Sequence, residues 1–318
     1  MKRQRKVTLL AVFLILALAL SACGKTTASQ SKTTENKTNK QVVTIGYLPI
    51  THALSIFEEK KLLENENSNI TIKLQKFSSW SDLTDALNAG RIDGASVLME
   101  LAMSAVSQGV DLKAVALGHK DGNVIIAGKD IQSVKDLKGK TFAIPHTQSS
   151  HNILLNDMLA KGGLTTKDVK VVQMAPSEMP SSLANGSIAG YCVAEPFGAQ
   201  AVNQKIGHVL YDCEDLWTNS LCCGLVFTGK FIKSNKATVK TLTTKYEEAG
   251  KKLDDKEATS IATQYLGQSE SVLKLSLKWI KFNDLKITKK DYNALVSKLK
   301  KYKINENPPA YDKFVYQP

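Results

Sequence analysis

The feature that most constrains the fold is an alternation of strand-like and helix-like segments. Residues 42–48 (VVTIGYL) and 69–77 (NITIKLQKF) are rich in β-formers, and the latter alternates apolar with polar residues. Residues 78–90 (SSWSDLTDALNAG) have helical apolar spacing, begin with serines and stop at a glycine, which is common after helix ends. A β-α-β-α order of this kind predicts a largely parallel sheet with helices on both faces.

The same alternation begins again near residue 129 and continues to about 225. Strands are predicted at 141–145 (TFAIP), 168–174 (DVKVVQM) and 189–196 (AGYCVAEP), with a helix at 149–163 between the first two. From residue 234 onward the sequence predicts amphipathic, Lys-rich helices.

Two similar α/β units joined by two chain crossings predict two lobes and a hinge. We expect the crossings near residues 127–129 and 225–228. Lobe one then comprises residues 42–127 plus 228–318, with the C-terminal helices packed on it. Lobe two comprises residues 128–227.

The N-terminus has the pattern of an export signal. A basic run, MKRQRK, precedes an apolar run that ends in Leu20-Ser21-Ala22-Cys23. We expect a signal peptide at 1–22 that is cleaved before Cys23. The alternative is an uncleaved anchor helix, but the apolar run is shorter than the roughly 20 residues of a membrane span. Residues 23–41 are almost wholly polar, which predicts a flexible tether.

The charge balance is basic, with 42 Lys and Arg against 30 Asp and Glu, a net charge of +12. Removing the signal peptide takes away four basic residues and leaves +8. Because the lysines are scattered and the chain carries an export signal, we expect no nucleic-acid partner. A solvated face near an anionic membrane or wall explains the charge.

Five cysteines are present, and none forms a CxxC pair, which disfavours a zinc ribbon. Cys222 and Cys223 are adjacent on a predicted strand, so we expect their side chains on opposite faces, one toward a cleft and one toward the core. Whether Cys192, Cys213, Cys222 or Cys223 form a disulfide stays open.

In open α/β sheets, ligands bind beyond the carboxyl ends of the strands, and clefts between lobes are favoured ligand sites. Four of the five histidines (His52, His119, His146 and His151) follow predicted strand ends. The candidate ligand-binding residues are Thr51, His52, Ser79, Trp80, Leu98, Met99, Asn123, His146, Thr147, Gln148, Ser149, Glu195, Phe197 and Cys222.

Helix N-termini suggest how such a cleft binds an anion. Thr51, and Thr147 to Ser149 within the stretch IPHTQSSHNILL, precede predicted helices whose free N–H groups would face the cleft. Lobe two contains no arginine, and Lys120 is the single cation near a predicted cleft loop. Trp80 and Phe197 are candidates for stacking on a planar ligand.

Several of these residues have structural alternatives. Ser149 and Ser150 are also suited to capping a helix, and Trp80 to the core. Glu195 is a candidate for pairing with a ligand amine or for a hinge role. His52 and His146 are also suited to bind a metal, but a metal cluster would need further carboxylates, so we expect no metal and no cofactor.

The segments LSAC, DLKGKTFAIP, LNAGRIDGA, GYCVAEPFGAQAV and DLWTNSLCCGLVF together resemble the solute-binding lipoproteins of ABC transporters. The closest resemblance is to the nitrate/sulfonate/taurine-type branch, which is also similar to binders of thiamine-pyrimidine precursors; it covers residues 42–318. It implies a type II periplasmic binding protein fold, a monomer, and lipidation of Cys23 at the outer face of the cell membrane.

The function that the resemblance implies is capture of a small organic anion or ring-containing solute and delivery to an ABC permease and its ATPase. One alternative is a lipid-anchored ligand sensor. Another is an enzyme similar to fungal pyrimidine synthases, since Cys222 with a histidine could act as a nucleophile and base. The chain lacks the CCCFC-like run of those enzymes, so we expect no enzyme activity.

Overall fold

The structure, a computed structural model, describes residues 40–318. The expected signal peptide, Cys23 and the tether up to residue 39 lie outside the described residues. No helix within residues 40–318 is long and apolar enough to cross a membrane.

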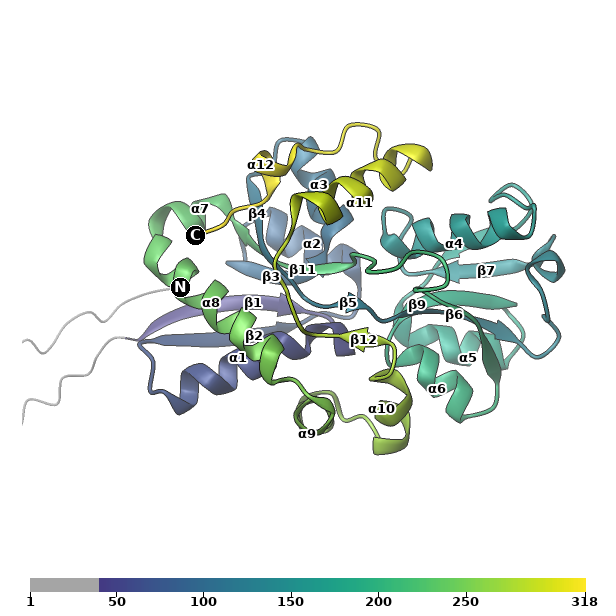
Figure 1. The fold of residues 1–318 in the computed structure, drawn as a ribbon, viewed down its shortest axis with the longest axis horizontal. Coiled ribbons are helices and arrows are strands. Elements are labelled where there is room, and N and C mark those ends of the chain that lie inside the picture. Colours follow the sequence, from purple (N-terminus) through teal and green to yellow (C-terminus); the bar gives the residue numbers. More distant parts are fainter. Residues whose placement is uncertain (1–39) are drawn as a thin grey trace, which may run out of the picture. The chain divides into compact units, whose positions relative to one another are not determined.

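Lobe one is built on a five-stranded sheet in the order β2-β1-β3-β11-β4 (Figure 1). Its strands are β1 (Gln41–Tyr47), β2 (Ile70–Lys76), β3 (Gly94–Leu98), β4 (Leu112–Leu117) and β11 (Cys223–Thr228). β1 is parallel to β2 and β3, whereas β11 is antiparallel to β3 and β4. The connections are η1 (Thr51–Ala53), α1 (Leu54–Asn65), α2 (Trp80–Asn88) and α3 (Met99–Ser107).

Lobe two repeats this plan with the strand order β10-β6-β9-β7-β8. Its strands are β6 (Asn123–Gly128), β7 (Thr141–Ile144), β8 (Lys170–Gln173), β9 (Gly190–Ala194) and β10 (Gly207–Asp212). Its helices are η2 (Val134–Leu137), α4 (Ser150–Lys161), η3 (Pro176–Glu178), α5 (Met179–Ala184) and α6 (Phe197–Asn203). β6 alone among these five strands runs against its neighbours, so the expected largely parallel sheets are confirmed in both lobes.

Both chain crossings lie earlier in the sequence than the pattern indicated. β6 pairs in the lobe-two sheet and β11 in the lobe-one sheet, so the crossings fall at residues 118–122 and 213–222. The expected boundaries at 127–129 and 225–228 are corrected by about one strand. The reason is that an apolar strand pairs equally well in either sheet, and only its partner decides which lobe it joins.

The two crossings are joined to each other and to the C-terminal region. Asp121 and Ser220 exchange hydrogen bonds: the Asp121 N–H donates to the Ser220 carbonyl (3.2 Å), and the Ser220 N–H donates to Asp121 Oδ1 (3.0 Å). The crossing strand β5 (Lys120–Asp121) also pairs with β12 (Ile280–Lys281). Lys281 forms an ion pair with the buried Asp121 at 3.2 Å. The hinge therefore contains three chain segments rather than two.

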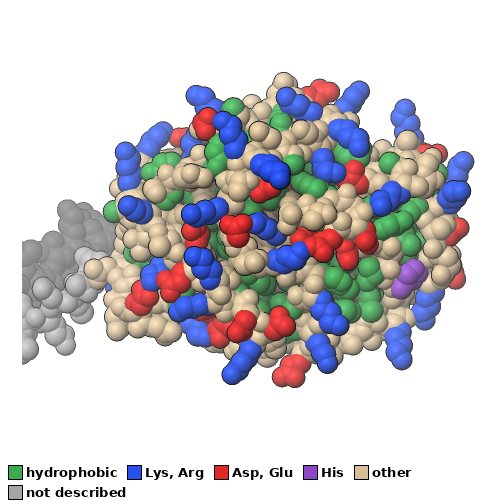
Figure 2. All heavy atoms as spheres, in the orientation of Figure 1, with side chains coloured by type: hydrophobic (Ala, Val, Ile, Leu, Met, Phe, Trp, Pro, Cys, Tyr) green, Lys and Arg blue, Asp and Glu red, His purple; other side chains and the backbone are tan. Residues whose placement is uncertain are grey.

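The C-terminal helices contact both lobes. They are α7 (Gly229–Ser234), α8 (Lys236–Lys252), α9 (Asp255–Leu266), α10 (Glu270–Ser276), α11 (Lys289–Lys301) and α12 (Tyr311–Phe314). α8 packs on α1 of lobe one, whereas α10 packs on α6 of lobe two. On the face shown in Figure 2, lysines are scattered and interspersed with acidic side chains, as expected for a solvated surface.

Candidate functional site

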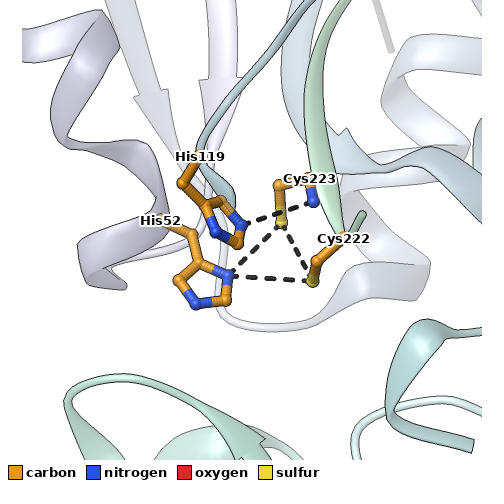
Figure 3. A group of neighbouring side chains, drawn as sticks. All are labelled: His52, His119, Cys222 and Cys223. Atoms are coloured by element: carbon orange, nitrogen blue, oxygen red, sulfur yellow. Dashed lines mark hydrogen bonds between the residues drawn. The ribbon is translucent and has the colours of Figure 1, made fainter. Parts of the chain in front are cut away.

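Three segments that are distant in sequence converge at the edge of the lobe-one sheet that faces lobe two. η1 follows β1 and carries His52, the loop after β4 carries His119, and the start of β11 brings Cys222 and Cys223 (Figure 3). All four side chains are fully buried. One potential ligand atom from each lies within 4.8 Å of all the others, and this group is called the His2Cys2 cluster below.

Short contacts connect three members of the His2Cys2 cluster. The Sγ atoms of Cys222 and Cys223 are 3.8 Å apart, and His52 Nδ1 lies 3.7 Å from the first and 3.8 Å from the second. The His119 ring stacks obliquely on the His52 ring, with a centroid separation of 3.6 Å. Two nitrogen and two sulfur donors thus face one another in a space closed to solvent.

The tautomer of His52 follows from its second ring nitrogen. Nε2 lies 3.0 Å from the carbonyl oxygen of Gly122, which can only accept a hydrogen bond. Nε2 therefore carries the proton, and the lone pair of Nδ1 points toward the two sulfurs. His119 Nε2 accepts a long hydrogen bond of 3.4 Å from the Cys223 N–H, and its Nδ1 has no hydrogen-bond partner within residues 40–318.

The sequence suggested that the two cysteines point to opposite faces of a strand, and this expectation is wrong. Both thiols are free, and their sulfurs approach to 3.8 Å. The physical reason is that β11 begins at Cys223, so Cys222 lies before the strand and is not bound by its alternation. No disulfide is formed by Cys192, Cys213, Cys222 or Cys223, which are the described cysteines.

The environment of the cluster shifts the pKa values of its residues in different directions. Burial raises the pKa of the Cys222 thiol, but the close contacts of Cys222 with the side chains of Cys223, His119 and His52 outweigh burial and hold the pKa well below its usual value. Burial and the nearby Cys222 sulfur raise the pKa of Cys223. Burial, aided by His52, lowers the pKa of His119 to about 4, which leaves that ring neutral near pH 7.

The facing wall in lobe two is also polar and buried. Thr51 bridges the lobes, because its N–H and its Oγ1 each donate to the Glu195 carbonyl oxygen at 2.9 Å. Ser150, His151, Glu195 and Asn123 are fully buried. Several of their polar atoms have no hydrogen-bond partner among the described residues: Asn123 Nδ2, Ser150 Oγ, both His151 ring nitrogens and Glu195 Oε1.

Such a concentration of unsatisfied polar atoms in one interior region needs an explanation, because buried polar groups are normally paired. Burial lowers the pKa of His151 to about 4, and the charges of Cys222, His52 and His119 also act on it. His151 therefore lies within electrostatic reach of the His2Cys2 cluster. Burial also raises the pKa of Glu195 to about 8, so its carboxyl is largely protonated at pH 7.

The structure brings together part of the set expected from the sequence. Thr51, His52, Asn123, Glu195 and Cys222 are linked by the contacts above or by the 3.8 Å approach of Cys222 Sγ to Asn123 Oδ1. Two apolar candidates adjoin them. Leu98 pairs with Cys223 across β3 and β11, and the Met99 N–H donates to the Cys222 carbonyl at 2.8 Å.

Three other candidates lie apart from this group. Ser79 caps α2 by accepting the Asp82 N–H, and Trp80 is buried in the core at the start of that helix. Phe197 lines a groove of about 510 Å³ that also involves Pro49 and Gly267.

The stretch 146–149 is divided by burial. His146 is half-buried and accepts the Gln148 N–H, Thr147 is exposed, and Ser149 is buried as the N-cap of α4. The residues of this stretch that reach the buried interior are the next two, Ser150 and His151.

Four functional candidates were missing from the expected site: His119, Cys223, Ser150 and His151. Two signals in the sequence point to three of them. His119 and His151 are among the four histidines at predicted strand ends, and Cys223 adjoins the candidate Cys222. Neither signal specifies which strand ends meet, because that depends on sheet order.

Comparison with known proteins identifies relatives of the whole folded region. A model of the NMT1-like family matches residues 36–267. The crystal structure of the ligand-binding component of an ABC-type import system from Staphylococcus aureus, with zinc bound, has a TM-score of 0.84 and 38% identity. That match covers 87% of this chain and 97% of the staphylococcal chain.

More distant relatives share the fold or part of the sequence. The alkanesulfonate-binding protein SsuA from Xanthomonas axonopodis pv. citri, bound to MOPS, has a TM-score of 0.74 at 19% identity, covering 87% of this chain and 98% of that chain. The nitrate import ATP-binding protein NrtC of Synechocystis is 26% identical over 250 residues. This match covers 72% of the chain but spans 37% of that relative's length. The expected two-lobe periplasmic binding protein fold is thereby confirmed.

Proposed function

The chain belongs to the NMT1-like family, and we propose that it is the extracytoplasmic solute-binding subunit of an ABC importer. The observation that carries this proposal is the buried polar interior between the lobes, where Asn123, Ser150, His151 and Glu195 leave hydrogen-bonding atoms without partners in the described chain. A solute enclosed there would satisfy them. Delivery to a permease and its ATPase follows from the import systems named for the relatives.

The closed arrangement supports capture by lobe closure. Thr51 of lobe one and Glu195 of lobe two are hydrogen-bonded to each other, and their neighbours are inaccessible to solvent. A solute can reach this interior only if the lobes separate about the hinge formed by residues 118–122 and 213–222. Closure then buries the solute and creates the joint surface that a permease would recognise.

The proposal includes a lipid anchor at Cys23 after cleavage of residues 1–22, and a monomer at the outer face of the cell membrane. The lipobox-like Leu20-Ser21-Ala22-Cys23 supports the anchor. The proposed role is binding and delivery without catalysis. The solute class expected from the sequence, a small organic anion or a ring-containing compound, is compatible with the N–H and O–H donors in this interior.

The test is ligand-induced stabilisation of the full-length protein in detergent. The panel contains nitrate, alkanesulfonates, pyrimidines and amino acids, together with Zn²⁺ because the staphylococcal relative was crystallised with zinc. A ligand at 100 times its Kd adds about 2.7 kcal/mol to the free energy of unfolding. Ser150→Ala should reduce the shift, whereas Ser181→Ala, at an exposed position of α5, should not.

Uptake in cells provides the second readout. Cells that lack the gene should lose uptake of the stabilising ligand and regain it with the wild-type protein but not with Ser150→Ala. Uptake that is unchanged without the gene would contradict the importer role.

A further inference from the structure

We propose that His52, His119, Cys222 and Cys223 form a tetrahedral binding site for one thiophilic d10 metal ion, such as Zn²⁺. The inference rests on the proposed function only in placing this ion in the capture cleft. It names a ligand class for the lobe-one wall that the sequence did not suggest, since we expected no metal there.

The spacing of the donor atoms fits a four-coordinate ion. Zn–S bonds of about 2.3 Å and Zn–N bonds of about 2.0–2.1 Å place two sulfurs of a tetrahedron about 3.8 Å apart, and a sulfur and a nitrogen about 3.6 Å apart. The sulfurs of Cys222 and Cys223 are 3.8 Å apart, and His52 Nδ1 lies 3.7 and 3.8 Å from them. These three atoms therefore already form one face of a tetrahedron.

His119 supplies the fourth donor. Its ring lies against that of His52, and its ligand atom is within 4.8 Å of the other three (Figure 3). The hydrogen bond between its Nε2 and the Cys223 N–H is long, at 3.4 Å. Such a bond is weak and restrains the ring little against a small shift toward the ion.

The outer shell orients His52 as a metal ligand. Metal-binding histidines usually donate their other ring N–H to a carbonyl or carboxylate, which fixes the tautomer and the ring. His52 Nε2 has this relationship with the Gly122 carbonyl oxygen at 3.0 Å. Gly122 has a φ of +83°, and a Cβ there would lie 3.1 Å from His52 Nε2, so a side chain would disturb this contact.

Backbone contacts hold the donor segments against each other before any ion binds. The Gly118 N–H donates to the Cys223 carbonyl at 2.8 Å, and Ser55 Oγ donates to the Gly118 carbonyl at 3.1 Å. The Met99 N–H fixes the Cys222 carbonyl at 2.8 Å. A site built on such connected segments loses little conformational entropy when it binds an ion.

The donor set selects the kind of ion. Two thiolates and two neutral imidazoles suit Zn²⁺ or Cu⁺, whereas Mg²⁺ and Ca²⁺ require oxygen ligands. Two thiolates also neutralise the charge of Zn²⁺, which matters because all four side chains are fully buried. His151, fully buried and without hydrogen-bond partners in the described chain, lies on the lobe-two side and would cover the ion when the lobes close.

The test is Co²⁺ binding to the reduced full-length protein, because Co²⁺ reports its ligands in the absorption spectrum. The proposal predicts one Co²⁺ per chain, sulfur-to-cobalt charge transfer in the near ultraviolet, and intense visible bands of a tetrahedral ion. Zn²⁺ should displace it with tighter binding. C222A and H52Q should weaken binding by more than the roughly 10–100-fold cost of losing an outer-shell partner.

C213A is the matched control, because Cys213 is also a free and buried thiol but is not part of the His2Cys2 cluster. It should bind Co²⁺ like the wild type, and melting curves establish that each variant is folded. Failure of the reduced wild type to bind Co²⁺ or Zn²⁺ overturns the proposal, as does equal binding by C222A and C213A. Solute stabilisation and uptake test the importer role separately, so that role can stand if the metal site fails.

Discussion

The carbonyl oxygen of Glu195 in lobe two accepts two hydrogen bonds from Thr51 in lobe one, one from the backbone N–H and one from Oγ1, each at 2.9 Å. Both residues are fully buried. This contact couples the wall that carries the His2Cys2 cluster to the wall that carries Ser150 and His151. Opening of the cleft would therefore break this contact.

Thr51→Val should favour the open state. The substitution keeps the shape of the side chain but removes one interlobe hydrogen bond, worth about 0.5–1.5 kcal/mol. We expect solute affinity to fall roughly 3–10-fold, and small-angle scattering to show a larger radius of gyration in the liganded protein at subsaturating solute. Thr51→Ser retains the hydroxyl and should behave like the wild type. If Thr51→Val and the wild type bind the solute with equal affinity, this hydrogen bond does not contribute to closure of the cleft.

Glu195→Gln should change how stability depends on pH. Burial raises the pKa of Glu195 from its usual 4.5 to about 8 in the folded protein. Between these values the unfolded chain releases the proton and the folded chain keeps it, so this carboxyl lowers stability as pH rises. The variant cannot ionise there, and its melting temperature relative to the wild type should increase from pH 5 to pH 8. A constant difference would show that the carboxyl ionises normally.

The two halves of the stretch 146–151 should contribute differently to solute binding. The sequence predicts that the double substitution of His146 and Thr147 by Ala weakens binding without unfolding the protein. In the structure, Thr147 is exposed and His146 half-buried, whereas Ser150 is fully buried with an unpartnered Oγ. We expect Ser150→Ala to reduce affinity more than the double variant, measured by titration calorimetry. A larger loss of affinity in the double variant would indicate that the solute binds closer to His146 and Thr147 than to Ser150.

Asp157→Asn should accelerate solute release. Asp157 on α4 of lobe two accepts from Lys298 Nζ (2.6 Å) and from the Tyr302 hydroxyl, both in the C-terminal segment around α11. Because these groups are partly exposed, we expect a loss of no more than about 1 kcal/mol, or roughly fivefold in the dissociation rate. Stopped-flow kinetics at low and high salt would measure it, with the exposed Asp312→Asn as the control. If the two variants release solute at the same rate, the ion pair does not hold the lobes together.

The repeated strand and helix pattern determined the architecture. Apolar periodicity specifies elements because burial of one face is a local property of the sequence. Serines before 80–88 and 150–161 predicted helix starts, and Ser79 and Ser149 are the observed N-caps of α2 and α4. The two-lobe plan and the largely parallel sheets could therefore be anticipated. The lobe membership of β6 and β11 could not, because sheet partners are chosen across long sequence separations.

The residue types of the site were also visible in the sequence, as histidines at strand ends and an adjacent pair of cysteines. Only the tertiary structure decided that His52 meets His119 and both sulfurs rather than His146. The loop after β4 and the start of β11 lie next to η1 because β11 inserts between β3 and β4 after the chain returns from lobe two. A donor set assembled from segments about 70 and 100 residues apart depends on that insertion. Local sequence fixes which atoms are available, and long-range strand pairing fixes which of them can share a ligand.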